Sequence, residues 1–129
     1  MLVKIDDMLI AANYPAVLTR LLMHQGISID CLFEGTRLKL SALDSPNARV
    51  SLQEYLTLIS NAKRYCTDPA LGLKLGEAMG VTTHGMLGIA AMSCQTFGEA
   101  VETASRYFTT RFPAMQFTCQ KQEQSIIIS

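Results

Sequence analysis

The spacing of apolar positions predicts a helix near the start of the chain. In NYPAVLTRLLMHQGI, residues 13–27, apolar side chains recur every three or four positions, which places them on one helical face. Pro15 suits the first turn because its missing N–H has no helical partner there, and Gly26 is typical of a helix end. Ile27 can then fold back on the apolar face.

The stretch that follows predicts little regular structure. ISIDCLFEG, residues 27–35, predicts a single helical turn. RLKLSALDSPNARV, residues 37–50, contains a turn signal in its Asp, Ser, Pro and Asn residues, and we expect it to form the longest connection of the chain.

A second long helix is predicted from VSLQEYLTLISNAKRYC, residues 50–66. Ser51 and Glu54 have the spacing of a capping box, in which the serine hydroxyl accepts a hydrogen bond from an N–H of the first turn. Apolar side chains follow at spacings of three and four, so one face of this helix is expected to be buried. Lys63 and Arg64 then point elsewhere.

Two further helices follow in the pattern. DPALGLKLGEAMG, residues 68–80, carries an apolar stripe closed by a glycine. TFGEAVETASRYFTTRFP, residues 96–113, opens with a second capping box, Thr96 with Glu99, and continues until Pro113 interrupts it.

The period changes after this helix. Met115, Phe117 and Cys119 alternate with polar residues, and IIIS follows a KQEQ turn, which predicts two strands. The predicted fold class is therefore α+β and predominantly helical, with about five helices followed by an antiparallel β-hairpin that is part of a larger sheet. The length of 129 residues suits one domain, residues 1–129.

Composition and charge narrow the function classes. Eleven basic and eleven acidic residues give a net charge of zero, whereas a domain that binds DNA usually has a basic excess on one face. The apolar runs are too short to cross a membrane, and no secretory signal is apparent, so we expect a cytoplasmic protein. The four cysteines form no CxxC pair, which argues against a zinc site.

The segment TTHGMLGIAAMS, residues 82–93, is the main candidate for a binding site. Thr82 or Thr83 can cap a helix on which Gly85 and Gly88 lie in line with a later alanine. Each glycine costs a helix about 1 kcal/mol relative to alanine, which suggests that something approaches the backbone closely. Either another element packs there, or N–H groups at the helix start bind a carboxylate or another anion.

Three side chains complete the candidate ligand site. His84 is expected in the first helical turn, where the helix dipole disfavours positive charge, so we expect it to be neutral. Tyr107 and Arg111 lie four apart and can present a hydroxyl and a guanidinium together. Arg111 can equally be a solvent-exposed cation near a helix end.

The sequence gives no support for catalysis. No serine lies in a nucleophile elbow, no cysteine lies near His84, and the paired carboxylates lie on polar faces. Haem ligation by a lone histidine is possible, although such a residue is far more often structural. We therefore expect no enzyme activity, no metal and no cofactor.

The order of these pieces resembles a known family. RLLMHQGISIDCLF, then RVSLQEYLTLISNAKRYCTDPALGLKLG, then THGMLGIAAMSCQTFGEAVETASRYF is similar to the arabinose-binding-like N-terminal regulatory domain of AraC-type transcription regulators. The resemblance covers roughly residues 10 to 128, and the succession of DPALGLKLG, THGMLG and TFGEA is its most specific part.

The resemblance implies a function in transcription control. In this family such a domain senses a small-molecule effector, mediates homodimerisation, or both, and DNA is bound by helix-turn-helix units in a C-terminal domain. No such units are found in these 129 residues, so the chain is expected to be a fragment that lacks the DNA-binding domain. We expect no membrane partner. The effector's identity does not follow from the resemblance. The alternative is a pure dimerisation module without an effector.

Overall fold

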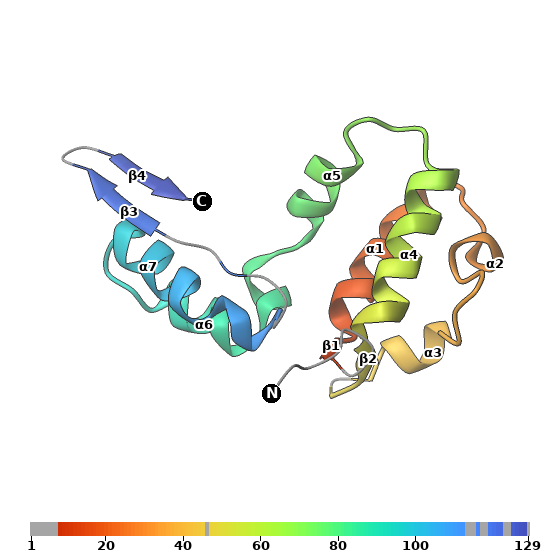
Figure 1. Cartoon of the computed structure of the whole chain (residues 1–129), viewed down its shortest axis with the longest axis horizontal. Helices are drawn as coiled ribbons and strands as arrows, with labels where there is room; N and C mark the ends of the chain where they lie inside the picture. Colours follow the sequence, from red (N-terminus) through yellow and green to blue (C-terminus); the bar gives the residue numbers. More distant parts are fainter. Residues whose placement is uncertain (1–7, 46, 113–115, 117–118, 123–124, 129) are drawn as a thin grey trace. The chain divides into compact units, whose positions relative to one another are not determined.

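A computed structural model describes residues 8–45, 47–112, 116, 119–122 and 125–128. The chain forms two compact units, with the boundary between Met79 and Gly80 (Figure 1). We call them unit 1 and unit 2.

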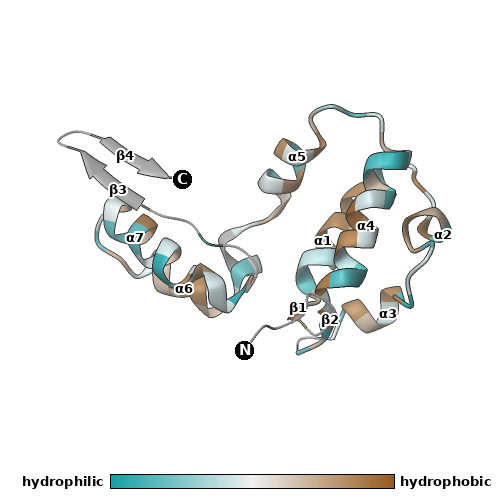
Figure 2. Ribbon diagram, in the orientation of Figure 1, coloured by the Kyte–Doolittle hydropathy of each residue, from teal (hydrophilic) through white to brown (hydrophobic). Residues whose placement is uncertain are grey.

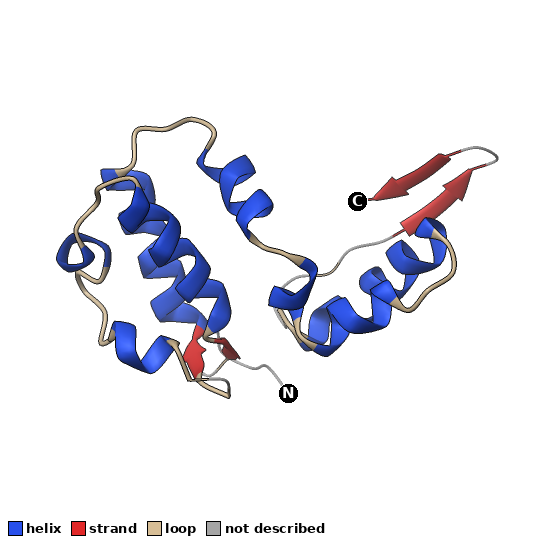
Figure 3. Cartoon of the chain, turned by 180° about the vertical axis from the view of Figure 1, so that it is seen from behind, coloured by secondary structure: helices blue, strands red, loops and turns tan. Residues whose placement is uncertain are grey.

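Unit 1 contains five helices and a short sheet. Figure 3 shows that helices make up most of it. Strands β1 and β2 pair antiparallel, with Ile10 opposite Val50. The elements in chain order are β1 (Leu9–Ala11), α1 (Asn13–His24), α2 (Ile29–Leu32), α3 (Leu40–Leu43), β2 (Arg49–Ser51), α4 (Leu52–Tyr65) and α5 (Leu71–Ala78).

The core of unit 1 lies mainly on α1 and α4. Both helices carry hydrophobic residues along their length (Figure 2). Full burial of one leucine contributes about 1.5–3 kcal/mol, so this apolar face is the main source of the unit's stability. The large apolar side chains that are almost fully buried are Ile10, Tyr14, Leu18, Leu22, Leu32 and Leu58.

Local signals set the ends of these helices. The Ser51 hydroxyl accepts a hydrogen bond from the Glu54 N–H at 3.1 Å, which confirms the predicted cap of α4. At the end of α1, Gly26 has a φ of 85°, and the Ile27 N–H donates to the Leu22 carbonyl at 3.1 Å. This is the glycine-terminated helix end that the sequence predicts.

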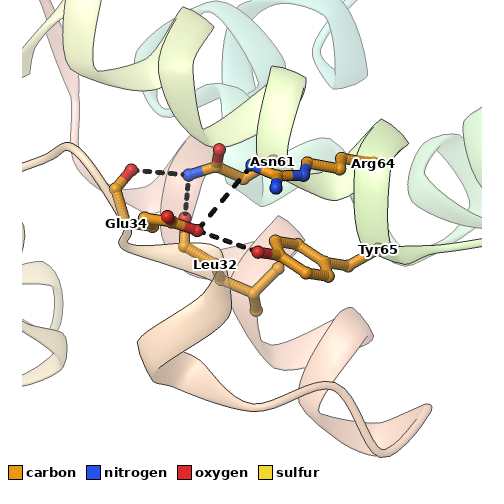
Figure 4. Close-up of polar contacts among 5 residues, drawn as sticks. All are labelled: Leu32, Glu34, Asn61, Arg64 and Tyr65. Carbon is orange, nitrogen blue, oxygen red and sulfur yellow. Dashed lines mark hydrogen bonds and ion pairs between the residues drawn. The ribbon is translucent and has the colours of Figure 1, made fainter.

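A buried amide holds the segment after α2 against α4. The Asn61 Nδ2 donates to the carbonyl oxygens of Leu32 and Glu34, both at 2.8 Å (Figure 4). The Tyr65 hydroxyl also donates to the Glu34 carboxylate at 2.8 Å. One α4 residue therefore satisfies two backbone acceptors, one on the last residue of α2 and one in the segment that follows it.

Unit 2 is built around a pair of helices that pack on each other, α6 (Met86–Met92) and α7 (Phe97–Tyr107). The Thr96 hydroxyl accepts a hydrogen bond from the Glu99 N–H at 3.1 Å, so the second predicted cap is also confirmed. The remaining elements are the 3-10 helices η2 (Val81–His84) and η3 (Phe108–Thr110) and the antiparallel strands β3 (Cys119–Gln122) and β4 (Ser125–Ile128).

The predicted fold class is wrong in the number and order of its elements. The described residues contain seven α-helices rather than about five, and an antiparallel sheet already forms at the N-terminal end, between residues 9–11 and 49–51. Each sheet in the described part has two strands, so the predicted larger sheet is absent there. Residues 37–50, predicted as a connection, contain α3 and β2.

The errors have a physical cause. A helix of four residues or a strand of three is too short to show a hydrophobic period. Pairing between strands about forty residues apart also leaves no local signal in the sequence. Met115 and Phe117, on which part of the strand prediction relied, lie outside the described residues, and so does Pro113, the predicted end of the preceding helix.

Candidate functional site

The segment that carries His84 and Gly85 begins as a 3-10 helix rather than as the predicted α-helix. The turn η2 ends at His84, and Gly85 follows with a φ of 60° and a ψ of −135°. Only after this glycine does α6 begin, at Met86. His84 therefore does not lie in the first turn of an α-helix, and the dipole argument for its charge state does not apply.

Arg111 lies directly against this glycine. Its Nη2 donates a hydrogen bond to the Thr83 carbonyl at 3.0 Å. A Cβ built on Gly85 would lie 3.1 Å from the Arg111 Nη1, which is closer than almost all real contacts of this kind. The position favours glycine because an L side chain is strained at this φ, and a Cβ there would also require the Arg111 guanidinium to shift by a few tenths of an ångström.

The surroundings of His84 favour its neutral form. Burial lowers the pKa of His84 from its ordinary value of 6.5, and the nearby positive charge of Arg111 lowers that pKa further. Both effects act in the same direction, since each disfavours the imidazolium. A neutral imidazole beside a guanidinium can donate one hydrogen bond and accept another.

The other two predicted residues stand apart from this cluster. Gly88 is buried in α6, which packs on α7, and this favours its interpretation as a position of close helix packing. Tyr107 is the last residue of α7 and is 50% exposed. Because the 3-10 turn η3 follows it, Tyr107 and Arg111 do not have the i,i+4 relation of an α-helix. In the described part no hydrogen bond joins the Tyr107 hydroxyl to Arg111.

The predicted residues therefore divide into two groups. Arg111, Gly85 and His84 come together in unit 2, and Thr83 joins them through its backbone carbonyl, a contact that no sequence pattern indicates. A guanidinium held in place by a backbone carbonyl suits a carboxylate-bearing ligand. Among the residues that the structure describes, no three His, Cys, Asp or Glu side chains gather as a metal site would require.

Unit 1 contains a groove that sequence reasoning missed. It has a volume of about 340 Å³ and is lined by residues of α1, α4, α5 and the segment between α4 and α5. We call it the α5 groove. Its walls are largely apolar, and α1 forms them together with the sequence-distant pair α4 and α5, so no local pattern could have revealed the groove. Its lining residues include Leu18, Ile59, Ala62, Lys63, Asp68 and Leu75.

Residues 26–129 match the family described as the arabinose-binding domain of AraC transcription regulator, N-term. The chain belongs to this family, and the resemblance predicted from the sequence is confirmed. The family is one of transcription-regulator domains.

Similar proteins are also transcription regulators by name. The chain is 37% identical over 100 residues to the ornithine utilization regulator of Pseudomonas aeruginosa. This alignment covers 78% of the chain and 30% of the relative. The chain is also 30% identical over 101 residues to an uncharacterized HTH-type transcriptional regulator of Mycobacterium tuberculosis, covering 74% of this chain and 29% of that protein. The chain thus spans less than a third of the length of these relatives. No helix in its described part is long and apolar enough to span a membrane.

Proposed function

We propose that residues 1–129 act as the effector-sensing and dimerisation domain of an AraC-type transcription regulator that works in the cytoplasm. The observation that carries this proposal is the family match over residues 26–129. In this proposal DNA is bound by a separate helix-turn-helix domain, and the present domain performs no chemistry. Effector binding shifts the population of a state in which the DNA-binding domains are correctly spaced.

The proposed effector site is the cluster in unit 2 formed by His84, Gly85 and Arg111. Gly88 and Tyr107, which were also predicted from the sequence to belong to the site, stand apart from this cluster and are not needed for it. The Arg111 guanidinium supplies positive charge, and the adjacent imidazole is neutral and able to donate a hydrogen bond. These groups favour a small effector that carries a carboxylate. The relative named as a regulator of ornithine utilization makes amino acids the first compounds to try.

A thermal-shift screen followed by calorimetry tests the effector site. The screen covers amino acids including ornithine, organic acids and sugars, and a true ligand raises the melting temperature with concentration. For a hit, we expect Arg111→Ala to weaken binding at least tenfold, because a charge-assisted hydrogen bond is lost. Arg106→Ala is the matched control, since Arg106 is exposed on α7 and pairs with Glu102 at 3.3 Å.

Two outcomes contradict this assignment. If both Arg111→Ala and His84→Ala bind a genuine hit with unchanged affinity, the site lies elsewhere. If no compound stabilises the protein, the effector-sensing proposal is refuted. The domain would then act in transcription control through subunit contacts alone.

A second candidate function is an interaction module without an effector, and the surface of α6 favours it. Large apolar side chains are exposed there and at the start of α7: Met86 is 77% exposed, Met92 66% and Phe97 78%. Exposed apolar patches often mark protein contacts. Sedimentation velocity discriminates, because a homodimer through this surface should dissociate in a Met86→Lys, Met92→Lys double variant. A wild-type chain that remains monomeric at high concentration contradicts the module.

A further inference from the structure

The shape of the α5 groove suits a small molecule rather than solvent alone. Small-molecule sites are mostly apolar concavities of about 300–1,000 Å³, and the α5 groove, at about 340 Å³, is at the small end of that range. Leu18 and Ala62 are buried in its floor, while Ile59, Leu71 and Leu75 are half-buried along it. A short hydrocarbon chain would remove further apolar surface from water at these walls.

The groove lining contains two opposite charges, Asp68 and Lys63, which differ in whether another side chain of the protein neutralises them. The Asp68 carboxylate accepts a hydrogen bond from the Ala70 N–H at 2.9 Å and pairs with Lys74. Lys74 does not line the groove. The hydrogen bonds from Lys74 and then from Ala70 lower the pKa of Asp68, so this acid stays ionised and neutralised by its partner.

Lys63 is the positive group of the groove lining. It projects from α4 at an exposed position. Within the described part of the chain its ammonium takes part in no ion pair and no hydrogen bond. With Asp68 already paired, the charge that remains to attract a ligand is positive, so an anionic head group complements the site.

We propose that the α5 groove binds a small anionic amphiphile, a molecule with a short aliphatic chain along Ile59, Leu71 and Leu75 and a carboxylate near Lys63. Sugars and other uniformly polar molecules fit poorly, because the apolar walls offer few groups to replace their hydrogen bonds with water. The groove lies wholly within unit 1, so it is a second site, separate from the effector site proposed at Arg111. This second proposal does not depend on the proposed effector-sensing function.

The two glycines of α5 provide a matched pair of variants. Gly72 lines the groove and Gly76 does not, while a Cβ at either position would have nothing within 4 Å. Gly72→Leu therefore adds an apolar side chain at the groove wall with no clash at its Cβ, and Gly76→Leu adds the same side chain at a position that does not line the groove. Both changes raise helix propensity equally, so the comparison isolates the blocking effect.

Calorimetry of the whole chain with octanoate, hexanoate and octylammonium tests the proposal. We expect saturable binding of octanoate, weaker binding of hexanoate by roughly fourfold for each lost methylene that the groove buries, and weaker binding of octylammonium. Gly72→Leu should weaken octanoate binding at least tenfold, and Gly76→Leu should leave it within twofold. Circular dichroism establishes that both variants are folded.

The charge is tested separately. Lys63→Met keeps most of the side chain but removes the ammonium, and we expect octanoate to bind about two- to fivefold more weakly, the range for an exposed ion pair. Lys63→Arg should restore the affinity. Lys39→Met makes the same chemical change at an exposed position away from the groove and should have no effect.

Several results overturn the proposal. Non-saturable uptake of octanoate, equal binding by Gly72→Leu and wild type, or tighter binding of octylammonium than of octanoate each contradict it. If Arg111→Ala abolishes octanoate binding while Gly72→Leu does not, the ligand occupies the unit 2 site, which supports the proposed function and refutes the α5 groove. Loss in Gly72→Leu with retention in Arg111→Ala supports the groove alone.

Discussion

Removal of the Asn61 amide should destabilise unit 1 more than any exposed change on α4. The Asn61 side chain is only 9% exposed, and its Nδ2 serves the carbonyls of Leu32 and Glu34 at 2.8 Å each. Leaving a buried acceptor unpaired costs about 1–3 kcal/mol, and the Glu34 carbonyl is only partly buried. Asn61→Ala should therefore lower the free energy of unfolding by about 2–4 kcal/mol.

Urea unfolding followed by far-UV circular dichroism measures this effect. With a slope of about 1–2 kcal/mol per molar urea, the midpoint should fall by roughly 2 M. Asn61→Leu keeps the volume but not the donors and should be nearly as harmful. Ser60→Ala, at the exposed neighbouring position, should stay within about 0.5 kcal/mol of wild type. If Asn61→Leu is as stable as wild type, packing rather than hydrogen bonding explains the anchor and our reasoning is refuted.

Three further predictions follow from single residues. Gly85→Ala should cost about 1–3 kcal/mol, because its φ of 60° is strained for alanine and the Arg111 guanidinium would have to shift. Gly76→Ala, with open space, should instead stabilise the protein by about 0.5–1 kcal/mol in thermal melts. Because the folded pKa of His84 is lowered, the unfolded state binds more protons, so stability should fall as the pH drops from about 6.5 towards the folded pKa, and His84→Gln should flatten this dependence in urea titrations at several pH values. Ser51→Ala should lower stability by about 1 kcal/mol, through loss of the α4 cap, and an unchanged urea midpoint would contradict that role.

Signals confined to a few neighbouring residues predicted structure well. The Ser51 cap of α4 and the Gly26 end of α1 need only local hydrogen bonds and dihedral angles, and both are present as predicted. The β1–β2 sheet was missed because its strands meet through tertiary contact across about forty residues. The four-residue helix α3 was missed because it is stabilised by its neighbours and has no pattern of its own.

Part of the candidate site was also predictable from local sequence signals. Glycines in an apolar run indicated that something approaches the backbone, and the group at Gly85 is the Arg111 guanidinium. Gly85 and Arg111 were predicted from the sequence to belong to one candidate site, but no local pattern could predict that the guanidinium lies directly against the glycine 26 positions away, nor the positive φ that moves the start of α6 to Met86. That this cluster receives an effector stays a prediction. The α5 groove has no sequence signature at all, because its walls come from three helices.

The last helix of unit 1, α5, is expected to open locally more easily than α1 and α4. None of the α5 residues is buried, and Leu73 is 81% exposed, although the helix forms one wall of a concave surface. An element with so little burial opens at a small fraction of the global unfolding free energy. Its amide hydrogens should therefore exchange with deuterium before those of α1 and α4, and any molecule that occupies the concavity would slow that exchange at α5 first.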